Sequence, residues 1–192
     1  MNDRRSFSHA IAEGDGISVI AAVHDPDGAR SAEAQRAEAL VVRSDPRAIR
    51  AASSLPILWR AEVAMSEAVE SADAVLLVFD DDGRFEQLHR EATGLGLDCA
   101  VEVRNEEDLE QALERIDPEI FLLSAAEGDD DETPLEIVLD LLAAVPAGKL
   151  AIADLPLVTP RETEELERAG CDAVIVATQD IAALAGDLPP AV

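Results

Sequence analysis

The sequence predicts an α/β fold, a minimal (β/α)8 barrel that occupies residues 1–192 as a single domain. Short apolar runs rich in Val, Ile and Leu alternate with amphipathic stretches, which is typical of parallel strands separated by helices. Eight such units share 192 residues, or 24 residues per unit, and this number favours closure of the sheet into a barrel. A doubly wound open sheet is the competing architecture.

The eight predicted strands are short apolar runs. Several are continuous in Val, Ile and Leu, as expected of strands that are buried on both faces. Trp59 ends the third run and is expected to pack in the barrel wall. In chain order the runs are residues 17–23, 39–42, 56–59, 74–79, 99–103, 119–123, 149–153 and 172–177.

Amphipathic patterns and capping residues predict the helices between these runs. Residues 106–116 carry apolar side chains on one stripe and acids on the other, with Asn105 placed as the N-cap. Thr159, followed by Pro and by a Glu at the third helical position, starts another helix that Gly170 closes. The remaining predicted helices are residues 31–38, which is very short, 63–71, 83–93 and 134–145.

The composition is that of a folded and very acidic protein. Asp and Glu number 41 against 15 Lys and Arg, giving a formal net charge of −26, while 48% of the residues are hydrophobic. Such a charge speaks against binding DNA, RNA or an anionic membrane. No apolar run is long enough to span a membrane, and the first six residues lack the apolar stretch of a signal peptide. A cytoplasmic location is therefore expected.

The basic residues are distributed unusually between the two types. Of the 15, 14 are Arg and one, Lys149, is Lys. High acidity with almost no Lys is typical of proteins from a salt-rich cytoplasm, where carboxylates keep the protein hydrated and salt screens their repulsion. The alternative is a surface that binds a basic protein partner. Cys99 and Cys171 form neither a disulfide framework nor a metal-site spacing.

Several segments, in order along the chain, are similar to those of one known family. The most specific is residues 101–109, Val-Glu-Val-Arg-Asn-Glu-Glu-Asp-Leu; residues 6–10, 16–21, 55–58, 72–77 and 164–174 also match. On these segments the chain resembles indole-3-glycerol-phosphate synthase. The resemblance implies a phosphate-binding barrel, here without most of the N-terminal extension. It also implies a carbon–carbon lyase of tryptophan biosynthesis that decarboxylates a phosphorylated anthranilate derivative and closes its ring, with no metal and no cofactor.

Carried over residue by residue, the resemblance gives three candidate catalytic residues. Glu102 keeps the family's glutamate on the fifth strand. Arg60 stands where the family has the lysine that is its principal acid, and His24 stands where a substrate-binding lysine is expected. Ala22 replaces another glutamate. A structural alternative for Glu102 is that it caps a helix or pairs with an arginine such as Arg60.

The substrate-binding positions are also altered. Ser124 stands where the family has an asparagine, and Asp154 begins the segment that replaces the family's Glu-Ser-Gly-Ile phosphate loop. Pro156 in that segment has no N–H to donate, although Thr178 after the eighth strand still offers a hydroxyl. Lys149 begins the seventh predicted strand and is therefore expected at the end of the barrel away from catalysis.

Three hypotheses follow from this pattern. The first is a barrel that has lost or repurposed the ancestral reaction and binds a small anionic or phosphorylated ligand, or a protein partner, at its mouth. The second is an active but divergent synthase that uses His24, Arg60 and Glu102. The third is a cation site made by His24, Asp80, Glu102 and Asp154 at the strand ends. The acidic residues 129–132 are expected to be a solvated loop.

Overall fold

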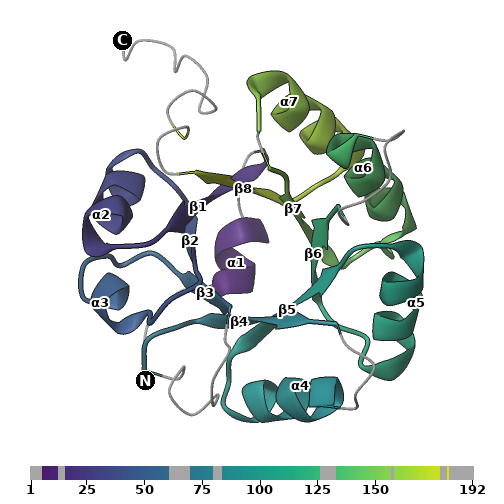
Figure 1. The fold of residues 1–192 in the computed structure, drawn as a ribbon, viewed down its shortest axis with the longest axis horizontal. Coiled ribbons are helices and arrows are strands. Elements are labelled where there is room, and N and C mark those ends of the chain that lie inside the picture. Colours follow the sequence, from purple (N-terminus) through teal and green to yellow (C-terminus); the bar gives the residue numbers. More distant parts are fainter. Residues whose placement is uncertain are drawn as a thin grey trace.

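The strands form a closed parallel barrel, which confirms the predicted fold class and excludes the open sheet. The computed structural model describes residues 6–12, 16–60, 70–79, 84–125, 133–156, 158–177 and 181. Each strand pairs with the next in chain order, and β8 pairs with β1 to close the ring (Figure 1). The strands are β1 Ser18–Val23, β2 Ala39–Val42, β3 Ile57–Arg60, β4 Ala74–Val78, β5 Asp98–Val103, β6 Ile120–Ser124, β7 Leu150–Asp154 and β8 Ala173–Ala177.

Helices surround the ring, except for the first, which lies across its centre in projection (Figure 1). Within the described residues no helix is long and apolar enough to cross a membrane. The helices are α1 Phe7–Ala12, α2 Pro26–Ala34, α3 Arg47–Arg50, α4 Arg84–Gly94, α5 Glu106–Arg115, α6 Pro134–Ala144 and α7 Pro160–Ala169.

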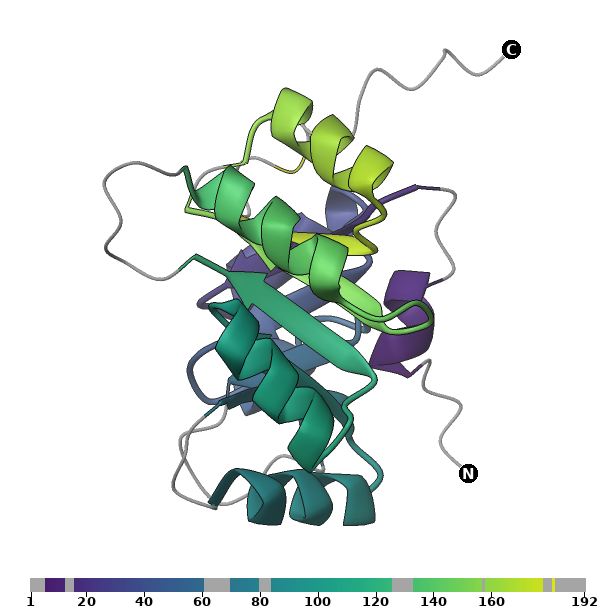
Figure 2. The same ribbon diagram turned by 90° about the vertical axis from the view of Figure 1, so that its right-hand side faces the viewer.

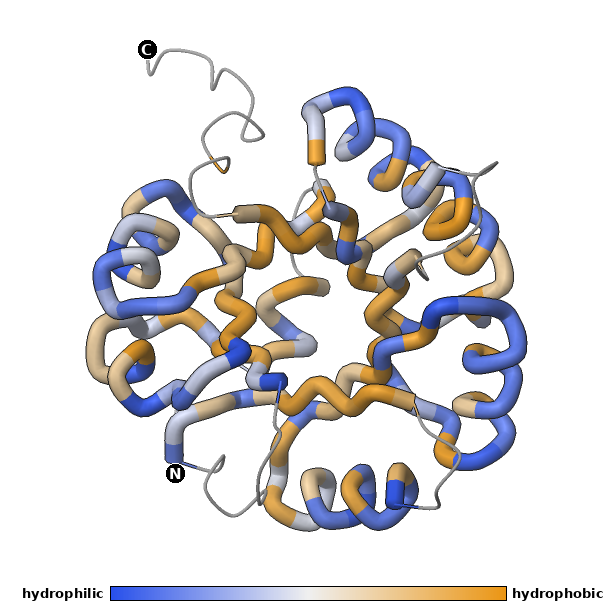
Figure 3. Tube along the Cα trace, in the orientation of Figure 1, coloured by the Kyte–Doolittle hydropathy of each residue, from blue (hydrophilic) through white to orange (hydrophobic). Residues whose placement is uncertain are grey.

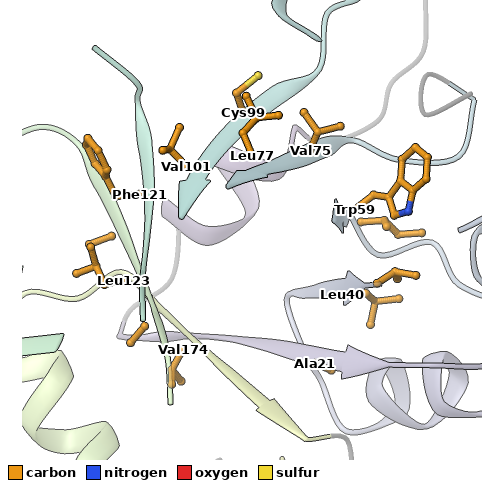
Figure 4. Close-up of a cluster of buried hydrophobic side chains, with 14 of the residues drawn as sticks. Ala21, Leu40, Trp59, Val75, Leu77, Cys99, Val101, Phe121, Leu123 and Val174 are labelled. Atoms are coloured by element: carbon orange, nitrogen blue, oxygen red, sulfur yellow. The ribbon is translucent and has the colours of Figure 1, made fainter. Parts of the chain in front are cut away.

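Alternation along each strand divides the buried side chains between two cores. One core fills the barrel interior. It is formed by alternate residues of each strand and includes Ile20, Val41 and Leu58. The other lies between the barrel wall and the helices and includes Leu40 and Trp59 (Figure 4). The hydropathy of the chain follows this division, with apolar strands inside and polar outer helix faces (Figure 3).

Helix α1 closes the barrel at the end where the strands begin (Figure 2). Its Phe7 and Ile11 are fully or almost fully buried and belong to the interior core. Two hydrogen bonds fix it there: the Ser8 N–H donates to Asp98 Oδ2 at 2.8 Å, and the Ser18 hydroxyl donates to the Ile11 carbonyl at 3.1 Å. The sequence analysis placed no helix before the first strand, because a six-residue helix is too short to show a periodic pattern.

The predicted elements agree closely with those of the structure, except that one helix is shifted and two short ones, α1 and α3, were not predicted. All eight strands lie within one residue of their predicted ends, and Asn105, Thr159 and Gly170 cap α5 and α7 as predicted. The first helix after β1 was predicted at residues 31–38, which is wrong, since α2 begins at Pro26. Asp25 is its N-cap and accepts from the Gly28 N–H. Most of the predicted helix 63–71 lies outside the described residues.

Carboxylates placed just before strands hold the beginning of the barrel together. Glu38, Asp73 and Asp172 each accept the N–H that begins or nearly begins the preceding strand, at 2.8, 2.9 and 2.8 Å. Lys149 also lies at this end, as predicted, and pairs with Asp117 at 2.9 Å and with Glu119 at 3.3 Å. This end of the barrel therefore uses its charged residues for structure.

Salt is expected to stabilise this fold. The net charge of −26 creates repulsion across the surface, and the screening length falls from about 10 Å at 0.1 M salt to about 3 Å at 1 M. We expect the midpoint of thermal unfolding, followed by circular dichroism, to rise from dilute buffer to molar KCl. An unchanged or lower midpoint would show that this repulsion does not limit stability.

Candidate functional site

The opposite end of the barrel, where the strands finish, holds a cavity of about 710 Å³. In (β/α)8 barrels this end carries the ligand sites. The inward alternation of the strands brings charged side chains to the cavity one layer above the apolar interior. The described residues that line it are Arg43, Arg60, Glu102, Arg104, Ser124, Ala125, Asp154 and Pro156.

Glu102 is the centre of the charge arrangement. Its side chain is 6% exposed, and its Oε1 accepts from Arg104 Nη2 at 3.0 Å, from Arg104 Nε at 3.2 Å and from the Ser124 hydroxyl at 3.2 Å. Arg60 Nη2 lies 3.3 Å from Oε2. Oε2 is buried and accepts no hydrogen bond within the described part of the chain, so this oxygen retains its capacity to accept one.

Arg104 is held from both its backbone and its side chain. It follows β5, and its N–H donates to Asp108 Oδ2 at 3.1 Å in the first turn of α5. Asn105 next to it caps the same helix. The start of α5 therefore fixes the backbone from which Arg104 reaches back to Glu102.

Asp154 and Arg43 form a second and looser pair. Arg43 Nη2 lies 3.7 Å from Asp154 Oδ2, beyond hydrogen-bond distance. Burial raises the pKa of the Asp154 carboxyl; Arg43 and Arg60 lower that pKa in part, while the neighbouring Glu102 raises it. The ionised form of Asp154 is thus disfavoured in the folded protein.

The charge of the cavity is opposite to that of the chain. Among the described residues, three arginines and two carboxylates line it, a net charge of about +1 with all five ionised, in a protein of net charge −26. Arginine presents planar paired donors that match carboxylates and phosphates. The cavity therefore favours a small anion.

Replacing Asp154 by Asn is expected to change the pH dependence of stability. The pKa of Asp154 is raised by folding, so its contribution to stability is complete below the unfolded pKa of about 4 and is lost as pH rises through the folded pKa. The unfolding free energy of Asp154→Asn minus that of the wild type should therefore increase from acid to neutral pH, as measured by urea unfolding.

Asp45→Asn is the matched control, because Arg47 lowers the pKa of Asp45. Its contribution is present above the unfolded pKa and is lost as pH falls through the folded pKa. The unfolding free energy of Asp45→Asn minus that of the wild type should therefore decrease from acid to neutral pH. Two variants with the same pH trend would contradict the opposite environments of these carboxyls.

The structure brings together four of the six candidate residues from the sequence. Arg60, Glu102, Ser124 and Asp154 share the cavity, and the expected pairing of Glu102 with Arg60 is present. His24 is exposed to solvent and is not among the lining residues, although it lies one residue after its strand, as Arg43 and Arg104 do.

Three other sequence hypotheses concern residues outside the described structure. Thr178 and Asp80 both lie there, and so do residues 129–132. Among the described residues, no group of three or more His, Cys, Asp or Glu side chains is arranged to hold a metal. Glu102, which the cation hypothesis required, is already paired with two guanidinium groups.

Arg43 and Arg104 line the cavity but were not predicted as site residues. Each lies one residue after a strand, at the position where the inward alternation of Val41 and of Glu102 would continue. Extending that alternation past the apolar runs would have found both. The apolar strand patterns alone could not reveal these two arginines, because each apolar run ends before its arginine.

A second cavity, of about 570 Å³, lies outside the barrel between α4 and α5. Arg115 in its wall pairs with Glu86 at 2.5 Å and stacks over the rings of Phe79 and Phe85. Burial lowers the pKa of His89 in the same wall. These contacts join α4 to α5, and the cavity is remote from the strand ends.

Comparison with known proteins points to one family. The sequence profile of indole-3-glycerol phosphate synthase matches residues 29–183. Indole-3-glycerol phosphate synthase of Geobacillus sp. (strain WCH70) is 30% identical over 135 residues, 67% of this chain and 52% of that protein. The enzyme of Geobacillus thermodenitrificans (strain NG80-2) is 26% identical over 165 residues, 77% of this chain and 64% of that protein. The chain thus spans between about half and two thirds of these relatives.

Solved structures share the fold at low sequence identity. N-acetylmannosamine-6-phosphate 2-epimerase from Clostridium perfringens superposes with a TM-score of 0.73 at 12% identity, over 95% of this chain and 94% of that one. Thiamine phosphate pyrophosphorylase from Pyrococcus furiosus gives a TM-score of 0.64 at 16% identity, over 87% and 88%. At such identities the likeness concerns the fold alone.

Proposed function

Since this chain belongs to the indole-3-glycerol phosphate synthase family, we propose that it is a member in which the ring-closing reaction is lost. In this proposal the barrel mouth binds a small anionic ligand instead. The observation that carries it is that the cavity is built on arginines, whereas the chain's one lysine, Lys149, is fixed at the other end of the barrel.

The chemistry of ring closure requires proton donors over the substrate, since a carbonyl must be protonated and a hydroxyl must leave as water. The resemblance assigns this work to lysines and glutamates; Arg60 stands in place of the lysine that is the principal acid, and His24 in place of a substrate-binding lysine. Arginine stays protonated in proteins and is a poor proton donor, and His24 is exposed outside the cavity lining. Loss of a general acid typically lowers a rate by about 10²- to 10⁴-fold.

The segment that replaces the family's phosphate loop also supports loss of the ring-closing reaction. Leu155 is buried, and Pro156, which lines the cavity, has no N–H to offer an anion. The arginines of the cavity are then its main donors to an anion. A salt-rich cytoplasm is part of the same proposal and is supported by the acidic, lysine-poor composition.

The alternative is an active, divergent synthase that uses His24, Arg60 and Glu102. The observation in its favour is that Glu102 is kept, buried at a strand end inside the cavity. In this alternative His24 would have to reach the cavity from its exposed position after β1, and Arg60 would bind the substrate as a cation.

Complementation separates the two readings. A tryptophan auxotroph that lacks its own synthase is transformed with this chain, and soluble expression is checked by immunoblot. We expect no growth without tryptophan, while a lysine-containing member of the family restores it. Growth that depends on Glu102, lost in Glu102→Gln at equal expression, would contradict the proposal and support the active enzyme.

A further inference from the structure

We propose that Arg43 and Arg60 form an anion subsite on the β2–β3 side of the mouth, and that Glu102 Oε2 accepts a hydrogen bond from the same ligand. The ligand class is then a small anion that carries a hydroxyl or amino group close to its charge. This inference rests on the proposed function, because it concerns the ligand of the same cavity.

The register of β2 and β3 places the two arginines side by side. Val42 pairs with Trp59, so the next register position sets Arg43 opposite Arg60. Both residues line the cavity, and the backbones of neighbouring strands lie only about 4.8 Å apart. Two like charges so placed repel each other, and an anion bound between them removes that repulsion.

The donors of these two arginines are not used by the described protein groups. Arg43 approaches Asp154 at 3.7 Å and Arg60 approaches Glu102 at 3.3 Å, but neither side chain donates a hydrogen bond to another described residue. Arg104 differs, since it gives Nε and Nη2 to Glu102. Arg104 thus holds Glu102, while Arg43 and Arg60 have donors for a ligand.

The second half of the proposal comes from Glu102. Its Oε1 accepts from Arg104 and Ser124, whereas Oε2 is buried without a hydrogen bond among the described residues. A buried acceptor of this kind is costly unless a partner is supplied. A carboxylate cannot donate, so the partner must be a donor, and a hydroxyl or amine beside the anionic group supplies it.

Asp154 acts as a competitor in this arrangement. It is the carboxylate nearest to Arg43 at 3.7 Å, and it is itself disfavoured as an ion by burial. An anion that takes the donors of Arg43 displaces this loose pairing. Neutralising Asp154 is therefore expected to strengthen anion binding, in the opposite direction to the loss of Arg43.

Calorimetric titration in low-chloride buffer tests the proposal with matched probes. Lactate is compared with propionate, which lacks the hydroxyl, and glycerol 3-phosphate is compared with propyl phosphate. We expect at least one hydroxylated probe to bind. We expect the matched probe without the hydroxyl to bind more weakly by a factor of about 10 or more. Binding of lactate would identify the preferred anion as a carboxylate, and binding of glycerol 3-phosphate would identify it as a phosphate.

Variants then locate the subsite. Arg43→Met is expected to weaken the probe that binds by about 10- to 100-fold, Asp154→Asn to tighten it, and the exposed control Arg168→Met to leave it within about twofold. Unchanged affinity in Arg43→Met, or no binding of any probe to the wild type, would overturn the subsite. Failure of the proposed function is a separate result, since it appears as growth in the complementation assay whatever the probes do.

Discussion

Glu102→Gln is expected to lower the free energy of unfolding by about 1–3 kcal/mol. Removing one partner of a buried ion pair is costly because charge is left uncompensated. Here Arg60 and Arg104 would lose their shared carboxylate. Their side chains are 28% and 43% exposed, so water screens part of the effect and the loss stays below that of a fully buried pair. Urea unfolding at neutral pH measures it.

Glu164→Gln is the matched control for this variant. Glu164 pairs with Arg168 at 3.9 Å on the surface of α7, and both side chains are mostly exposed. Exposed pairs of this spacing contribute about 0.3–0.5 kcal/mol. If the two substitutions have equal effects, the two-arginine arrangement around Glu102 does not contribute to stability as described.

Phe7→Ala is expected to lower the free energy of unfolding by about 3–4 kcal/mol. Phe7 is 0% exposed and packs in the barrel interior from α1. Truncating a fully buried Phe removes its apolar contacts and leaves a cavity. Denaturant unfolding measures the loss, and the far-UV spectrum shows whether the folded barrel persists.

Phe7→Leu serves as the conservative comparison, since a hydrophobic exchange of nearer volume usually costs less than about 1.5 kcal/mol. An unfolding midpoint of Phe7→Ala equal to that of the wild type would show that α1 is not an integral part of the interior core. If both variants lose the same free energy of unfolding, strain at this position explains the loss better than a cavity does.

The barrel could be predicted because its strands repeat one physical pattern. Several of the eight runs, such as residues 39–42, are continuous apolar segments that need no tertiary information to recognise. Capping residues such as Asn105 and Thr159 are equally local, because the side chain binds the N–H of the third helical residue. The start of α2 at Asp25 carried the same signal and was overlooked.

Helix α1 could not be predicted in the same way. It has six residues, too few for a helical period, and it is stabilised by distant partners such as Asp98 and the interior core. Isolated helices of this length are unstable in water. Tertiary packing, which the sequence does not display locally, accounts for this element.

The candidate site was predictable as far as strand ends determine it. Arg60, Glu102, Ser124 and Asp154 were expected at the mouth and lie in its cavity. His24 was expected there too, but its side chain is exposed to solvent and is not among the lining residues, although Arg43 and Arg104, which also follow a strand end, do line the cavity. The pairing of Arg43 with Asp154 joins β2 to β7, and only the closed ring brings these two strands close enough.

A single-turnover reaction tests the central claim most directly. Protein in excess over the phosphorylated anthranilate-type substrate of the family is incubated at the salt concentration that gives the highest unfolding midpoint, and indole product is followed by fluorescence. We predict that the substrate is recovered unchanged, while a lysine-containing family member under the same conditions converts it. Indole formation by the wild type that disappears in Glu102→Gln would contradict the account and establish an active synthase.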